Sequence, residues 1–145
     1  MVLVPVIMAV TIMAIIDDND DNNDDTPVSN NLKITIGPVS FNATLDNNET
    51  AKAFKRLLPM TVDMSELHGN EKYYYLSKGL PTASSNPGTI RTGDLMLYGS
   101  TCVVLFYETF STSYTYTRLG RITNPSGLAS ALGSGGVNVT FEITD

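Results

Sequence analysis

Two apolar runs stand close together in residues 95–107, which read LMLYGSTCVVLFY. Residues 95–98 and 102–107 are almost entirely apolar, and Gly99 and Ser100 between them are typical turn residues. Nearly continuous apolar runs of this length are typical of strands that are buried on both faces. The segment therefore predicts a hairpin in the core of a β-sheet.

Segments at both ends of the folded part alternate apolar and polar residues. The alternation is clearest in residues 137–143, VNVTFEI, and a period of two predicts a strand with one buried face. Residues 32–36 and 39–43 show the same alternation on either side of Gly37 and Pro38, which predicts a second hairpin. The first and last strands are therefore available to pair with each other.

Two further strands are predicted between these segments. Residues 72–76, KYYYL, are rich in aromatic residues, which favour strands. Residues 114–122 predict another strand. A bulge is expected at Gly120, because Leu119 and Ile122 would otherwise face opposite sides of the sheet.

Two short helices complete the predicted elements. The first can be capped by Asn47 or Asn48 and ends at Pro59. The second is expected to start at Pro125 and to end before Gly133. Closing the sheet would remove its exposed edges. We therefore predict a mainly β fold, a closed barrel of about eight strands with two short capping helices.

A candidate ligand site centres on Arg118, which shares a predicted strand face with Tyr114 and Tyr116. An arginine beside aromatic rings is suited to bind a carboxylate or an amide carbonyl in an apolar groove. Residues 77–93 are rich in Gly and Pro and predict a long loop, which would form one wall of the site. The candidate binding residues are Arg118, Tyr114, Tyr116, Arg91, Tyr107 and Glu71.

The charged and sulfur-containing residues exclude several functions. The net charge is −6, but six of the fifteen acidic residues lie within residues 17–25, and the other nine face nine basic residues. The folded part therefore lacks the basic surface that nucleic-acid binding requires. Cys102 is the single cysteine and His68 the single histidine, too few for a disulfide or a Cys/His metal site. We predict a buried Cys102, no metal, no cofactor and no Ser-His-Asp triad.

The first 31 residues differ in composition from the rest. Residues 1–16 are almost wholly apolar but would span only about 22 Å as a helix, so no stable membrane span is expected. An incomplete export signal is the favoured interpretation, and a membrane anchor or an apolar segment packed on the domain are the alternatives. Residues 17–31 are rich in Asp and Asn and predict a solvated linker. Residues 32–145 are predicted to form the folded domain. We expect a monomeric protein that is exported to the periplasm or cell envelope, with a cytoplasmic location as the alternative.

Three short motifs stand in order along residues 32–144. They are HGNEKYYYL at 68–76, Gly93-Asp94 before the apolar hairpin, and Gly120-Arg121-Ile122. In this order they resemble the bacterial cyclophilin-like family of unknown function. The resemblance implies a closed cyclophilin-type barrel and no particular activity.

Three functions are compatible with this resemblance. Catalytic cyclophilins carry a Phe-His-Arg motif whose arginine weakens the double-bond character of an X-Pro amide. This sequence has no Phe-His-Arg motif, so we expect a non-catalytic module that binds a peptide or a small molecule. One alternative is a prolyl isomerase that uses Arg91 or Arg118 instead. The other, implied by the family's association with flavodoxin-like proteins, is a partner domain of a redox flavoprotein.

Overall fold

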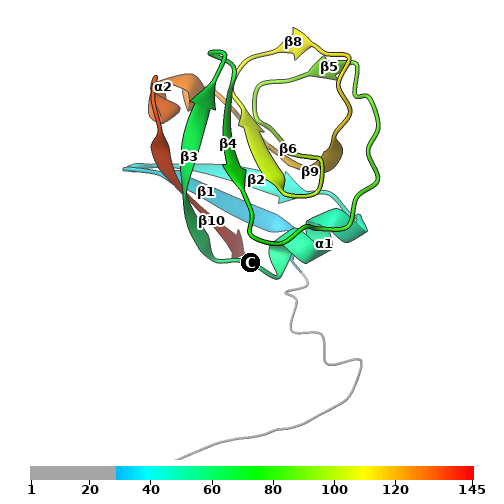
Figure 1. Ribbon diagram of the computed structural model, residues 1–145. Helices are drawn as coiled ribbons and strands as arrows, with labels where there is room; N and C mark the ends of the chain where they lie inside the picture. Colours follow the sequence, from blue (N-terminus) through cyan, green and yellow to red (C-terminus); the bar gives the residue numbers. More distant parts are fainter. Residues whose placement is uncertain (1–28) are drawn as a thin grey trace, which may run out of the picture.

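The structure, a computed structural model, describes residues 29–145 (Figure 1). Residues 1–28, which contain the predicted apolar segment and most of the predicted linker, lie outside the described residues. The strands are β1 (Asn31–Ile36), β2 (Val39–Leu45), β3 (Met60–Leu67), β4 (Glu71–Tyr75), β5 (Thr89–Ile90), β6 (Asp94–Tyr98), β7 (Cys102–Phe106), β8 (Phe110–Ser111), β9 (Thr117–Ile122) and β10 (Val137–Thr144), and the helices are α1 (Glu49–Lys55) and α2 (Leu128–Leu132).

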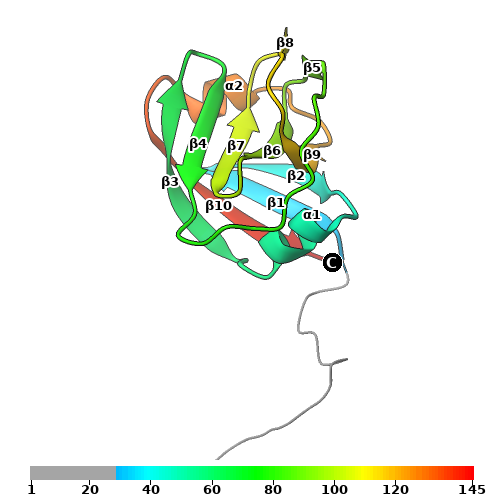
Figure 2. The same cartoon turned by 45° about the vertical axis from the view of Figure 1, so that its right-hand side comes forward.

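Eight of the strands form a barrel that closes through β1. The strand order is β1-β10-β3-β4-β7-β6-β9-β2, and β2 returns to pair with β1. Ile34 of β1 stands opposite Phe141 in β10 and opposite Phe41 in β2. The first and last strands therefore lie side by side, as Figures 1 and 2 show. The predicted mainly β fold, a closed barrel of about eight strands with two short helices, is confirmed.

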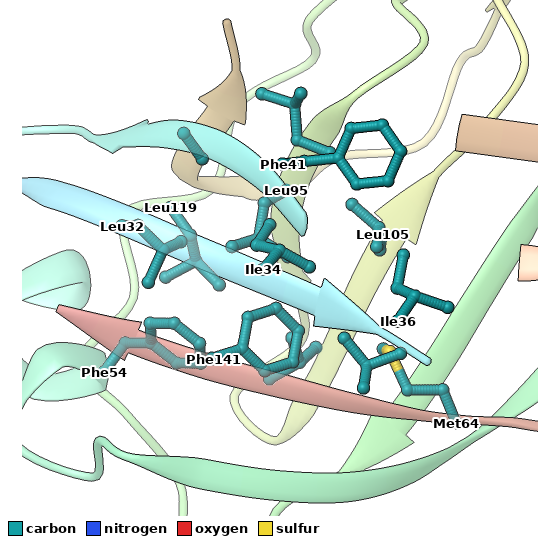
Figure 3. Packing of buried hydrophobic residues seen from close by; sticks show 14 of the residues in the cluster. Leu32, Ile34, Ile36, Phe41, Phe54, Met64, Leu95, Leu105, Leu119 and Phe141 are labelled. Atoms are coloured by element: carbon teal, nitrogen blue, oxygen red, sulfur yellow. The ribbon is translucent and has the colours of Figure 1, made fainter. Parts of the chain in front are cut away.

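The interior of the barrel is the main hydrophobic core. The alternation predicted for the end strands turns Leu32 and Ile34 of β1 and Phe141 of β10 inward, where they are fully buried (Figure 3). The β6–β7 hairpin contributes Leu95 to this core and Met96 to a second core on its other side. The hairpin is thus buried on both faces, as its apolar sequence predicts.

Helix α1 covers one side of the barrel. Asn48, and not Asn47, caps it, and the Asn48 Oδ1 accepts a hydrogen bond from the Ala51 N–H at 2.7 Å. Phe54 packs edge-on against Phe141, with ring centroids 5.7 Å apart. The helix therefore closes the main core through one buried aromatic contact.

Helix α2 is shorter than predicted. It begins at Leu128 rather than at Pro125, because Gly127 has a φ of 83°, which lies outside the helical region. Leu128 and Leu132 are buried, so this helix caps the barrel. It lies on the side opposite to α1 (Figure 1). Among residues 29–145, no helix is long and apolar enough to span a membrane.

Strand β3 is absent from the sequence-based prediction, although it pairs with both β10 and β4. Val62 and Met64 are buried, whereas Thr61, Asp63 and Ser65 are exposed. This is the period of two of a half-buried strand. Met60, Val62 and Met64 already alternate with polar residues in the sequence, so the sequence-based prediction missed a local signal for this strand.

Strand β9 begins later than predicted. It starts at Thr117, and residues 114–116 lie outside the barrel strands. Tyr116 instead makes an isolated bridge to Ser85, with backbone hydrogen bonds of 2.9 and 3.0 Å. The chain before β9 is therefore attached to the segment that follows β4.

The bulge predicted at Gly120 lies at the preceding residue. Leu95 of β6 pairs with Gly120, and the next residue, Met96, pairs with Arg118. Leu119 is therefore the extra residue, and its side chain is fully buried. The bulge leaves Arg118 beside Met96, on the side of the sheet that faces away from the barrel interior.

Candidate functional site

Four neighbouring strands, β4, β7, β6 and β9, together form a face that is directed away from the barrel interior. On β4, Tyr73 packs against the second core, whereas Tyr74 packs against the main core. The register then places Tyr73, Val104, Met96 and Arg118 in one row across the four strands. We call this side the outer face, and its residues are Glu71, Tyr73, Tyr75, Cys102, Val104, Phe106, Asp94, Met96, Tyr98 and Arg118.

Residues 77–93 fold over part of the outer face. The sequence predicts a long loop here, but the segment contains β5, which pairs with β8 (Figure 1). The Gly88 carbonyl also accepts a hydrogen bond from the Thr112 N–H at 3.0 Å. A second hydrophobic core lies beneath, made of Ile90, Met96, Cys102, Val104, Phe106 and Tyr116.

A first hollow of about 390 Å³ lies where β6 and β9 meet this covering segment, and we call it the arginine pocket. Three arginines line it together with one carboxylate, that of Asp94. Its positive residues come from two places that are distant in sequence, the segment before β6 and the strand β9. The lining residues are Ser85, Pro87, Thr89, Arg91, Asp94, Met96, Tyr116, Arg118 and Arg121.

Two carboxylates hold the Arg118 side chain. Its Nε donates to Asp46 Oδ2 at 3.2 Å, and its Nη2 lies 3.8 Å from Asp94 Oδ1. Asp94 is buried and also accepts a hydrogen bond from the Arg91 backbone N–H at 2.9 Å. Within residues 29–145, the buried Nη2 has no hydrogen-bond partner, although 33% of the side chain is exposed. Two carboxylates therefore hold the guanidinium in place, and the partly exposed side chain borders the pocket.

A second hollow of about 350 Å³ shares Tyr116 with the first, and we call it the tyrosine pocket. The Tyr98 ring centroid lies 5.6 Å from that of Tyr116 and 6.1 Å from that of Tyr114. On the β4 side, the Tyr73 and Tyr75 rings pack edge-on at 5.7 Å. The remaining lining residues are Leu67, His68, Glu71, Cys102 and Val104.

Four ionisable groups that line the tyrosine pocket have raised pKa values, namely Glu71, Tyr75, Cys102 and Tyr116. Burial raises the pKa of Glu71, an effect that nearby His68 opposes and Glu66 increases. Burial and the charge of Glu71 raise the pKa of Cys102 to about 11. Cys102 is buried, as predicted, and a thiol with this pKa is a poor nucleophile at neutral pH. Within residues 29–145, no three His, Cys, Asp or Glu side chains are placed to hold a metal ion.

Tyr107 lies apart from both pockets. Its side chain packs in the main core, and its hydroxyl donates a hydrogen bond to Glu66 Oε1 at 2.7 Å. Burial and the Glu66 carboxylate raise the pKa of Tyr107 to about 12. The structure thus places this predicted binding residue in a polar network inside the barrel, and not on the outer face.

The other five predicted binding residues come together around Tyr116. Arg91 and Arg118 line the arginine pocket with it, and Glu71 and Tyr114 line the tyrosine pocket with it. The period of two in residues 71–75 is a local signal that places Glu71, Tyr73 and Tyr75 on one face. The strand register was needed to find the other lining residues. The lining residues that sequence reasoning missed include Tyr73, Tyr75, Tyr98, Asp94 and Arg121.

The closed eight-stranded barrel with two adjoining hollows on its outer face defines a small β-barrel domain of the cyclophilin type. The chain belongs to the Cyclophilin-like family, whose sequence model matches residues 34–142. It is also similar to the solution structure of a hypothetical protein from Archaeoglobus fulgidus, with a TM-score of 0.60 and 20% identity, over 83% of this chain and 98% of that one. At this identity the likeness shows the fold alone. No curated protein matches the sequence.

Proposed function

We propose that this chain is a non-catalytic binding module that holds a peptide or a small molecule on its outer face. The observation that carries the proposal is that Tyr116 lines both the arginine pocket and the tyrosine pocket. The arginine and tyrosine side chains therefore border two hollows that adjoin at Tyr116, and we call the two together the recess. Membership of the Cyclophilin-like family supports the barrel that presents this recess.

The arginine pocket suits an oxygen acceptor. Arg91, Arg118 and Arg121 outnumber the single carboxylate of Asp94, so the pocket favours a carboxylate or the carbonyl oxygens of a peptide. Asp46 and Asp94 already hold Arg118 in place. Less side-chain entropy is then lost when a ligand binds.

The tyrosine pocket suits a bulkier part of the same ligand. Tyr75, Tyr98 and Tyr114 keep 64%, 48% and 64% of their surface exposed. Clustered, exposed aromatic residues are typical of binding surfaces. The volumes of the two hollows, about 390 and 350 Å³, also fall within the range of small-ligand sites.

The test is an NMR titration of the full chain with the tetrapeptide Ala-Ala-Pro-Phe, which supplies a carboxylate, carbonyl groups and an aromatic ring. Saturable shifts are expected at the residues that line the two pockets. Arg118→Ala should weaken binding about tenfold, the size expected for the loss of a charge-assisted hydrogen bond. Arg121→Ala serves as the second variant, because Arg118 also supports Asp94. Lys33→Ala, in β1 and outside both pockets, is the control.

Two outcomes would overturn this proposal. One is the absence of any saturable shift. The other is unchanged affinity in both Arg118→Ala and Arg121→Ala, which would remove the arginine pocket from the site. The same peptide also distinguishes binding from catalysis: faster cis/trans relaxation of its Ala-Pro bond, lost in Arg118→Ala, would make the chain an isomerase. Export, a monomeric state and a flavodoxin-like partner stay predictions from the sequence.

A further inference from the structure

The Glu71 carboxylate lies in the tyrosine pocket, where His68 is the nearby basic side chain that lowers its pKa. Within residues 29–145, no hydrogen bond or ion pair to it is found, although Lys72 is its neighbour in sequence. Lys72 points to the other side of β4 and pairs with Glu66 instead. A half-buried carboxylate of this kind is suited to pair with a cationic group that enters the pocket from outside.

Tyrosine rings surround this carboxylate on the outer face. Tyr73 and Tyr75 follow Glu71 at alternate positions of β4, and Tyr98, Tyr114 and Tyr116 line the opposite part of the pocket. The face of an aromatic ring carries negative charge density, so it attracts a cation within about 6 Å of its centre. Rings and a carboxylate together therefore favour a positive group over a negative or neutral one.

The two halves of the recess differ in charge. The arginine pocket has three arginines, whereas no lysine or arginine lines the tyrosine pocket, in which His68 is the one basic side chain. Cys102 contributes a neutral thiol to its lining, because the pKa of this thiol is about 11. Among the described residues, this lining thus offers an anion His68 and hydroxyl donors, but no guanidinium or ammonium group.

We infer that the tyrosine pocket binds an alkylated ammonium group, with the rings around the methyl groups and the Glu71 carboxylate as the counter-ion. The inference rests on the proposed function and specifies its ligand as an organic cation. The volume of about 350 Å³ accommodates such a group and leaves the adjoining arginine pocket for an acidic or carbonyl group of the same molecule.

The experiment compares two probes of nearly the same shape, choline and its neutral isostere 3,3-dimethylbutan-1-ol, by NMR titration of the full chain. Choline is expected to give saturable shifts at Glu71, Tyr75 and Tyr98, and the isostere to bind about tenfold more weakly, since only the positive charge differs. Glu71→Gln and Tyr98→Leu should each weaken choline binding several-fold. Glu49→Gln is the control, because it removes the same charge from the exposed surface of α1.

Equal binding of the two probes, or no effect of Glu71→Gln and Tyr98→Leu, would overturn the inference. So would the absence of choline binding while Ala-Ala-Pro-Phe still binds, and in that case the proposed binding module would stand. Failure of the tetrapeptide and both small probes would overturn the inference and the proposed function together. Amide spectra of Glu71→Gln and Tyr98→Leu verify that each variant is folded.

Discussion

The ammonium group of Lys72 is fully buried and pairs with the Glu66 carboxylate, with Nζ and Oε1 2.8 Å apart. The same Nζ donates to the carbonyl oxygens of Gly133 at 2.8 Å and Gly135 at 2.6 Å. All three ammonium donors are thus used. These contacts connect β3, β4 and the chain that follows α2. The Lys72 Nζ also lies 5.4 Å from the centre of the Tyr107 ring.

Replacing this lysine should destabilise the fold. Lys72→Met removes the ion pair of Glu66 and leaves two buried backbone carbonyl oxygens without this donor, and we expect the free energy of unfolding to fall by about 2–4 kcal/mol. Urea unfolding measures the change. The control is Lys33→Met, because the exposed Lys33 lies 3.8 Å from Glu142 and such pairs contribute less than about 1 kcal/mol. Equal losses in Lys72→Met and Lys33→Met would contradict the structural role of Lys72.

The pKa of Glu66 predicts part of the pH dependence of stability. Burial by itself raises this pKa, but hydrogen bonds from Lys72, Tyr107 and the Gly69 N–H together lower it below its ordinary value. A lowered pKa in the folded state stabilises the fold above the unfolded-state pKa, and this contribution is lost as the pH falls through the folded-state pKa. Glu66→Gln should therefore be less stable than the parent at pH 7, by about 1–3 kcal/mol.

The difference between Glu66→Gln and the parent should shrink as the pH falls below the ordinary glutamate pKa and then through the lowered folded-state pKa, where the carboxyl group becomes protonated in the folded chain as well. Urea midpoints at neutral and acidic pH measure it. A stability difference that stays constant across this range would show that the charge of Glu66 is not the cause.

Glu71 is expected to behave in the opposite way. Its pKa is raised, chiefly by burial, so the folded chain takes up a proton more readily than the unfolded chain. Stability is then lost as the pH rises from the unfolded-state pKa through the raised folded-state pKa. Glu71→Gln should raise the thermal midpoint at pH 7, and the gain should disappear in acid. A lower midpoint at pH 7 would mean that the carboxylate has a stabilising partner after all.

Gly120 permits the close approach of β9 to β2. A Cβ added there would overlap the carbonyl oxygen of Thr44 and lie 3.0 Å from Leu45 Cα, and backbone atoms cannot move aside cheaply. Gly120→Ala is expected to lower the free energy of unfolding by about 1–3 kcal/mol. Gly135→Ala is the matched control, since a Cβ there meets nothing within 4 Å. Similar urea midpoints for Gly120→Ala and Gly135→Ala would contradict this packing.

Cys102, the single cysteine of the chain, should react slowly with iodoacetamide. Because its pKa is about 11, the thiolate fraction should rise about tenfold per pH unit from pH 7 to 9.5 without levelling off. Ser100→Cys combined with Cys102→Ser places the thiol in the exposed β6–β7 turn as a control. There the rate should level off near the ordinary thiol pKa, about 8.5. A plateau in the parent at the same pH would contradict the burial of Cys102.

Local sequence patterns predict most of the barrel. The two apolar runs in 95–107 and the alternation in 137–143 indicate strands because burial repeats along each segment on its own. The bulge beside Gly120 was also predictable, since Leu119 and Ile122 must both turn inward. β3 was missed although Met60, Val62 and Met64 alternate with polar residues in the same way, and its pairing with β10 and β4 makes the strand evident.

The sequence by itself determined most of the strands along the chain and which residues of each predicted strand share a face, because side-chain direction alternates locally. The tertiary structure alone decided which faces meet. Arg118 donates a hydrogen bond to Asp46, which is 72 residues away in sequence, and Lys72 donates one to Gly133, which is 61 residues away. Such contacts depend on the closure and register of the barrel, which no local pattern encodes. The two adjoining pockets on the outer face therefore exist only in the folded chain.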